Sequence, residues 1–159
     1  MSTNLVGLVC WILFTFLAAI SGAVTAQAAA AFYGQLDKPR WAPPAWAFGP
    51  AWSVLYPMMA VAAWTIWRDY GFRGARGPLI MYAIQLALNA AWSWFFFVRR
   101  RGAEALVEVV LMWIAIAITL VAFWRLHTSA GILFVPYILW VSFATALTYS
   151  VWRRNPTLL

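Results

Sequence analysis

The chain is 159 residues long, 65% hydrophobic and only 9% charged, and its mean hydropathy is +0.80. Soluble domains are typically about 25% charged, so this composition excludes an ordinary soluble protein, and an aromatic content of 18% excludes a disordered one. The net charge of +7 does not indicate a nucleic-acid partner, because the basic residues lie between apolar stretches, as membrane-flanking anchors do. We therefore expect one domain over residues 1–159: an all-α integral membrane protein, built as a bundle of five transmembrane helices.

A spanning helix needs roughly 20 apolar residues, and five segments of the chain meet this requirement. The expected spans cover about 5–30, 45–67, 78–98, 104–124 and 130–152. In the first span, small residues recur every four positions, at Ala18, Gly22, Ala26 and Ala30. Such a face lets a second helix approach closely. The polar segment that follows contains three prolines over 33–44 and predicts a loop.

The basic residues also predict an orientation. With five spans, seven Lys and Arg residues lie on the side of the C-terminus and the first loop, and four lie on the other side. The positive-inside rule then places the C-terminus and the first loop in the cytoplasm, if the protein inserts into an inner membrane of bacterial type.

The third span has two distinct faces. Gln85 and Asn89 lie four residues apart and share a face with Trp92. Because amides are costly in hydrocarbon, they either bond between helices or line a ligand cavity. The opposite face carries alanines at four-residue spacing, Ala83, Ala87 and Ala91. This face favours close packing, either inside the bundle or across a homodimer.

Aromatic residues recur at helical spacing in the second and fifth spans. Trp52 and Tyr56 lie four apart in the second span, and Trp140 and Phe143 belong to one stripe of the fifth. Such stripes are typical of core packing or of an aromatic belt at the membrane interface. A belt does not account for Trp140, which lies near the middle of its span.

The residues that carry catalytic chemistry are few. The single histidine, His127, has no cluster of metal-ligating residues beside it in sequence, so we expect no metal site. No Ser-His-Asp spacing or phosphate-binding glycine loop is visible, and we expect no cofactor. Glu104 and Glu108 lie one turn apart at the start of the fourth span. We interpret both as structural, because the helix dipole and the preceding arginines stabilise carboxylates there.

Three motifs together resemble a known family. They are KPRWAPPAWAFGPAWSVLY at 38–56, QLALNAAWS at 85–93 and PYILWVSFATAL at 136–147. In this order they are similar to the signature of the TspO/MBR family, the tryptophan-rich sensory proteins related to the mitochondrial translocator protein. The resemblance covers nearly the whole chain.

The resemblance implies a five-helix bundle, commonly a homodimer, in which Ala83, Ala87 and Ala91 form the contact. It also implies a pocket opening toward the first loop that binds porphyrins, sterols or benzodiazepine-site drugs. Matching pocket positions are Trp52, Asn89, Trp140 and Ala144, with Tyr33, Trp41, Trp46, Tyr56, Trp92, Phe143 and Leu147 as further lining. We therefore expect a membrane receptor or transport protein that binds porphyrin as a ligand and not as a cofactor. The alternative is an enzyme that degrades porphyrin with light and oxygen, for which Trp52 and Trp140 are the catalytic candidates.

One position departs from the family pattern. The family usually carries Asn where this chain has Thr148. The surrounding residues Leu147, Tyr149 and Arg153 fit a proposed sterol motif, and Thr148 weakens that assignment. For a porphyrin, Lys38 and Arg40 of the first loop are the expected donors to the propionates.

Overall fold

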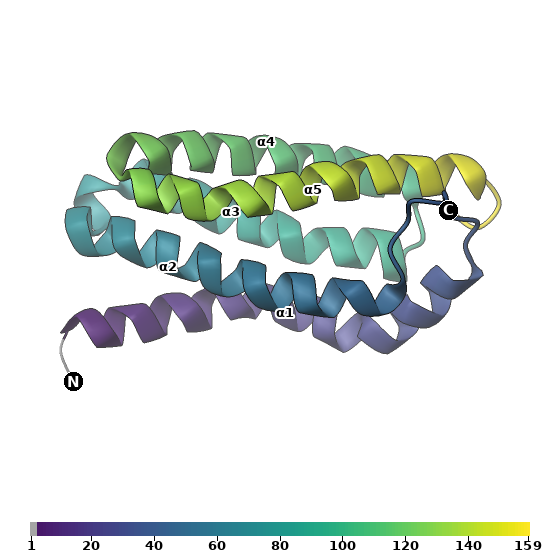
Figure 1. The fold of residues 1–159 in the computed structure, drawn as a ribbon, viewed down its shortest axis with the longest axis horizontal. Helices are drawn as coiled ribbons and strands as arrows, with labels where there is room; N and C mark the ends of the chain where they lie inside the picture. The colour runs from purple at the N-terminus through teal and green to yellow at the C-terminus, as the bar shows by residue number, and fades with distance from the viewer. Residues whose placement is uncertain (1–2) are drawn as a thin grey trace.

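The computed structural model describes the backbone of residues 3–159, and the side chains of that range except residues 3, 21 and 25–28. The described chain is entirely helical and contains no strand. Its long helices are α1 (Thr3–Gln35), α2 (Phe48–Gly74), α3 (Arg76–Ser93), α4 (Gly102–Leu126) and α5 (Thr128–Arg154). Two short elements complete the chain, a 3-10 turn η1 (Ala45–Ala47) and a π-helical turn η2 (Trp94–Val98) (Figure 1). The all-α class is confirmed.

Four stretches of the described chain are long and apolar enough to cross a membrane. They are Asn4–Val24, Arg76–Val98, Gly102–Leu126 and Thr128–Arg154. The span predicted over 45–67 covers η1 and most of α2, and α2 does not reach the same hydropathy. Polar aromatic residues, Pro57 and the charged residues near its C-terminus lower the mean value for this helix.

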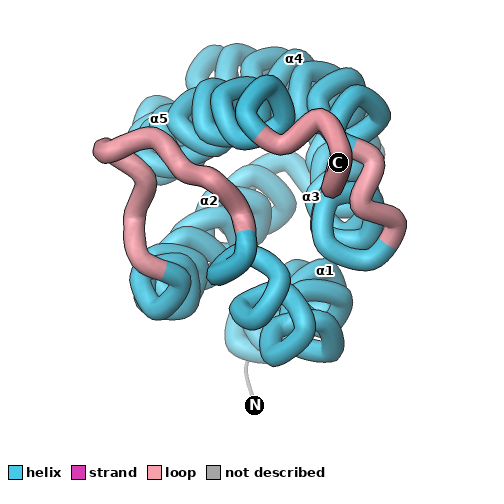
Figure 2. The backbone as a smooth tube through the Cα atoms, turned by 90° about the vertical axis from the view of Figure 1, so that its right-hand side faces the viewer, coloured by secondary structure: helices cyan, strands magenta, loops and turns pink. Residues whose placement is uncertain are grey.

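The five long helices form a closed ring. Going around it, α1 packs on α2, α2 on α5, α5 on α4, α4 on α3, and α3 returns to α1 (Figure 2). The first loop and the C-terminus lie at one end of the elongated bundle, and the start of α1 lies at the other (Figure 1). The buried aromatic side chains Tyr82, Phe134 and Tyr137 fill the middle of the ring.

The turn between α4 and α5 is very tight, since His127 alone separates the two helices. Gly131 allows this approach. A Cβ atom at Gly131 would lie 2.6 Å from the Trp124 ring and 2.8 Å from the Trp124 Cα atom. The backbone of α4 therefore excludes any larger residue at this position unless the helices separate.

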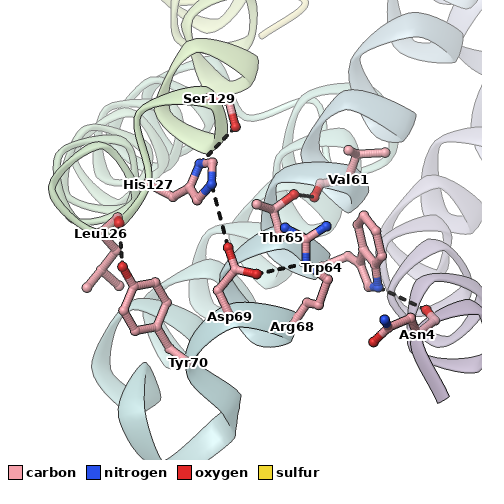
Figure 3. Close-up of polar contacts among 10 residues, drawn as sticks. All are labelled: Asn4, Val61, Trp64, Thr65, Arg68, Asp69, Tyr70, Leu126, His127 and Ser129. Carbon is pink, nitrogen blue, oxygen red and sulfur yellow. Dashed lines mark hydrogen bonds and ion pairs between the residues drawn. The ribbon is translucent and has the colours of Figure 1, made fainter.

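A polar cluster ties α2 to this turn (Figure 3). The turn lies at the end of the bundle away from the first loop (Figure 1). Arg68 Nε donates a 2.7 Å hydrogen bond to Asp69, and His127 Nε2 lies 3.5 Å from the same carboxylate. Tyr70 donates to the Leu126 carbonyl at 2.6 Å. The Arg68 hydrogen bond lowers the pKa of the Asp69 carboxyl. These contacts join segments far apart in sequence.

Ser129 extends the same cluster, because its Oγ atom lies 2.8 Å from His127 Nδ1 (Figure 3). The order of Ser129, His127 and Asp69 resembles a hydrolytic triad, but the imidazole is reversed. In such a triad the carboxylate holds Nδ1 and the serine faces Nε2. Neither of the two cavities described below contains these residues. We interpret the cluster as a structural connection.

Gly131→Ala tests the tight turn. We expect a loss of about 1–3 kcal/mol in the free energy of unfolding, because the new methyl group overlaps α4. The measurement is reversible unfolding in mixed micelles. Gly77→Ala is the control, since a Cβ atom there meets nothing within 4 Å, and it should retain or slightly raise stability. Equal stability of the two variants would contradict this account.

The Asp69 cluster predicts a dependence of stability on pH. The folded pKa of Asp69 is lowered, so its carboxylate stabilises the fold at neutral pH, and this contribution is lost as pH falls through the folded pKa. The effect is small because both partners are partly exposed to solvent. Thermal unfolding should show a smaller loss of stability between pH 6 and about pH 3 in Asp69→Asn than in the wild type. Parallel curves for the two proteins would refute the assignment.

Candidate functional site

A cavity of about 480 Å³ lies between α1, α2 and α3 and reaches the start of α2 near the first loop. This volume lies within the range of small-molecule pockets, about 300–1,000 Å³. Its walls are mostly aromatic and small apolar side chains. Tyr33 and Phe16 come from α1, Trp52 from α2, and Trp92 from α3. One buried amide, that of Asn89, enters this apolar lining.

The structure places the sequence-predicted ligand residues in two groups. Those that line the cavity are Tyr33, Trp46, Trp52, Tyr56, Asn89 and Trp92. Those outside its lining are Trp41, Trp140, Phe143, Ala144 and Leu147. The second group, apart from Trp41, belongs to α5, which contacts α2 on the side away from α1. The predicted residues therefore form two neighbouring aromatic regions, one lining the cavity and one on α5 and the first loop. They do not form a single cavity wall.

Trp52 joins the two regions. Its ring stacks on Tyr56 inside the cavity, with centroids 5.2 Å apart and an interplanar angle of 28°. It also meets the Trp140 ring edge-on at 6.5 Å. On the α5 side of Trp52, the Trp140 and Phe143 ring centroids lie 5.7 Å apart. The Phe143 and Trp41 ring centroids are also 5.7 Å apart, and Trp41 belongs to the first loop. Trp52 thus separates the cavity from the aromatic group on α5.

A chain of hydrogen bonds forms the polar part of the cavity wall and continues into the bundle. Tyr56 donates to Asn89 Oδ1 at 2.8 Å, and Asn89 Nδ2 donates to the Tyr137 hydroxyl at 3.1 Å. Tyr137 in turn donates to Gln85 Oε1 at 2.8 Å. All four side chains are buried. The two alternatives for these amides are therefore both realised at Asn89, which bonds between helices and also lines the cavity.

Lys38, in the first loop, stabilises the end of α1. Its ammonium donates to the Tyr33 and Leu36 carbonyls at 2.7 and 3.0 Å, and so caps the C-terminal end of α1. Tyr33 holds the first loop by donating to the Pro43 carbonyl at 2.9 Å, and burial raises the pKa of Tyr33. Arg40 remains exposed.

The first loop is also held to the C-terminal segment. The Asp37 N–H donates to Asn155 Oδ1 at 2.9 Å, and Asn155 Nδ2 donates back to the Asp37 carbonyl at 2.9 Å. Asn155 is buried despite following the last turn of α5. This pair fixes the base of the loop beside the end of the chain (Figure 2).

Of the wall that α1 contributes, sequence reasoning predicted Tyr33 but missed the small residues. Gly22 and Ala30 line the cavity, and Ala18 is buried nearby on the same helix. Their four-residue spacing was a usable signal, because a smooth helix face can border a ligand as well as a helix. The side chain of Ala26, also predicted on this face, lies outside the described residues.

The remaining predicted residues lie away from the cavity. In the single chain, Ala87 is exposed and Ala83 and Ala91 are half-buried. In the sterol motif, Leu147 is 6% exposed but Tyr149 is 53% exposed, so the two point to different sides of α5.

Tyr137→Phe tests the hydrogen-bond chain. It removes the hydroxyl that accepts from Asn89 and donates to Gln85, and leaves two buried amides without that partner. We expect a loss of about 1–3 kcal/mol in the free energy of unfolding. Tyr149→Phe is the matched control on the exposed side of α5 and should change stability by less than about 0.5 kcal/mol. A Tyr137→Phe variant as stable as this control would show that the chain contributes nothing.

Comparison with known proteins identifies relatives over almost the full length. The TspO/MBR family model matches residues 9–153. A tryptophan-rich sensory protein of Cereibacter sphaeroides is 42% identical over 149 residues, which cover 91% of this chain and 92% of that protein. The human translocator protein is 41% identical over 126 residues, 78% of this chain and 75% of that protein. A tryptophan-rich protein TspO of Archaeoglobus fulgidus is 33% identical over 153 residues, 96% and 99% of the two chains. The chain therefore belongs to the TspO/MBR family of membrane proteins.

Proposed function

We propose that this protein binds porphyrins and related hydrophobic ligands in the cavity between α1, α2 and α3, as a membrane receptor or transport protein. The observation that carries the proposal is the aromatic wall around one buried amide. Trp52 and Tyr56 present stacked rings to a cavity of about 480 Å³, and Asn89 supplies the polar group. A flat, apolar macrocycle with a few polar substituents matches such a lining.

Binding of the macrocycle depends on stacking and on contacts at the rim. The single histidine of the chain, His127, lies in the turn between α4 and α5. This turn is at the opposite end of the bundle from the first loop (Figure 1), so His127 is not placed to ligate iron in this cavity. Lys38 already caps α1, which leaves Arg40 as the first-loop cation for a propionate. The indole N–H of Trp92 is buried without a partner in the described residues and lines the cavity. It is a second donor for the ligand.

The proposal includes five membrane spans: the four candidate spans of the described chain and, in addition, α2. Although α2 is less apolar than the others, it packs between α1 and α5, both of which contain candidate spans. For insertion into an inner membrane of bacterial type, we place the C-terminus and the first loop in the cytoplasm, on the basis of the basic residues. The partly exposed face of Ala83, Ala87 and Ala91 supports a homodimer through α3.

An enzyme that degrades porphyrin with light and oxygen is the second candidate. The contact between Trp52 and Trp140 supports it. When the Trp52 indole gives an electron to a photoexcited porphyrin, the porphyrin is reduced, and the Trp140 indole can in turn reduce the oxidised Trp52. This reading predicts bleaching under light that depends on both residues.

Trp52→Leu tests ligand binding. Removing the stacking ring should weaken protoporphyrin binding about two- to tenfold, measured by titration of protein fluorescence in the dark. Trp94→Phe is the control, because Trp94 is 54% exposed and does not line the cavity. Its affinity should stay at the wild-type value. Absence of saturable binding to the wild type at micromolar porphyrin would refute the proposed function.

The same samples separate the two candidates when they are illuminated. If the wild type and a Trp52→Phe/Trp140→Phe variant bleach bound porphyrin at the same rate, the enzyme reading fails and the binding reading stands. If only the wild type accelerates bleaching, the protein is an enzyme.

A further inference from the structure

Glu108 of α4 is a buried acid that the proposed function does not use. It is 6% exposed, and neither carboxyl oxygen has a hydrogen-bond partner among the described residues. Two buried donors on the neighbouring helix α3, Gln85 Nε2 and Trp92 Nε1, are also unpaired, yet neither reaches it. Buried polar groups are almost always bonded. An unpaired carboxyl in an apolar helix therefore indicates a missing partner.

Glu108 lines a second hollow, an open groove of about 520 Å³ between η2 and α4. The other residues of this groove are Phe95, Ala103, Glu104, Val107 and Leu111. It shares no residue with the cavity between α1, α2 and α3. Val107 and Leu111 are 61% and 52% exposed, and Ile114 and Ile118 continue this apolar face along α4. In a bilayer such a face lies against acyl chains.

The groove begins beside a basic turn. Arg101 is paired with Glu104 at 2.5 Å, and Arg99 lies over the Phe95 ring at 5.8 Å. Arg99 has no carboxylate within ion-pair distance in the described part of the chain. The groove therefore has a cationic end at the turn, an unpaired acid next to it, and an apolar floor beyond.

The depth of Glu108 suits a lipid headgroup. It lies six residues into α4, about 9 Å from the start of the helix. This position is four residues, about 6 Å, inside the expected span 104–124. Because helical side chains lean toward the N-terminus, the Glu108 carboxyl lies closer to the headgroup boundary than its Cα atom does. Both carboxyl oxygens are enclosed in the free chain, so binding requires the Glu108 side chain to rotate into the groove that the residue lines.

We propose that this groove binds a zwitterionic phospholipid with a primary amine, such as phosphatidylethanolamine. The ammonium pairs with Glu108, the phosphate pairs with Arg99, and an acyl chain lies over Val107 and Leu111. A primary ammonium donates three hydrogen bonds, whereas the quaternary amine of phosphatidylcholine donates none. An anionic headgroup without an amine leaves Glu108 unpaired. The chemistry of the groove therefore selects the amine.

The experiment is a lipid competition on the full chain. Purified protein is exchanged into equimolar dioleoyl phosphatidylethanolamine and dioleoyl phosphatidylcholine, and the lipids that remain bound are counted by native mass spectrometry. We expect the wild type to prefer phosphatidylethanolamine about tenfold, the value of one charge-assisted hydrogen bond. Glu108→Gln should reduce the preference to less than about twofold. Asp37→Asn, an exposed acid at the same end of the bundle, is the matched control and should retain it.

A second variant covers the case in which Glu108→Gln fails to fold. Ala103→Leu fills the groove from its exposed rim and leaves Glu108 in place. It should also abolish the preference. Porphyrin affinity of both folded variants should match the wild type, because neither residue lines the other cavity. A wild type without preference, or a folded Glu108→Gln variant that keeps it, overturns the proposal.

Discussion

The hydrogen-bond chain from Tyr56 through Asn89 and Tyr137 to Gln85 determines how the helices face one another. These groups are buried where water cannot replace a lost partner, so α2, α3 and α5 must present them at one depth. Apolar contacts tolerate small rotations of a helix, whereas hydrogen bonds do not. Fixing these three helices fixes the side of α2 that carries Trp52, and with it the wall of the cavity.

The sequence predicted this inward face well, and it predicted the division of the aromatic residues poorly. Gln85 and Asn89 were identifiable because an amide in an apolar helix has few favourable places. The separation of Trp140 and Phe143 from the cavity was not identifiable, because it depends on how the Trp52 ring lies between α2 and α5. Periodicity shows which residues share a helix face but does not show how two facing stripes divide the space between them.

The long helix with the lowest apolar character, α2, carries the stacked aromatic pair of the cavity, Trp52 and Tyr56. Trp52, Ser53 and Tyr56 line the cavity, and the same residue types keep α2 below the hydropathy of the other long helices. A wall that meets a ligand needs polar and aromatic groups, whereas a wall that meets lipid does not. The reduced hydropathy of α2 thus reflects the polar and aromatic side chains that it presents to the cavity, opposite the small apolar residues of α1. Glu108 was misjudged from the sequence. Its place near a helix start suggested a structural role, but its carboxyl oxygens have no hydrogen-bond partner among the described residues.

The reciprocal bonds between Asn155 and the backbone of Asp37 give the last residues of the chain a mechanical role. The Asn155 side-chain amide is both donor and acceptor, so it fixes the backbone at Asp37, where the first loop begins. The first loop can move as a unit only if these two hydrogen bonds break or the C-terminal segment moves with it. The C-terminal segment therefore helps to position the first loop. A fusion partner or label attached after Leu159 would perturb the loop through these two hydrogen bonds.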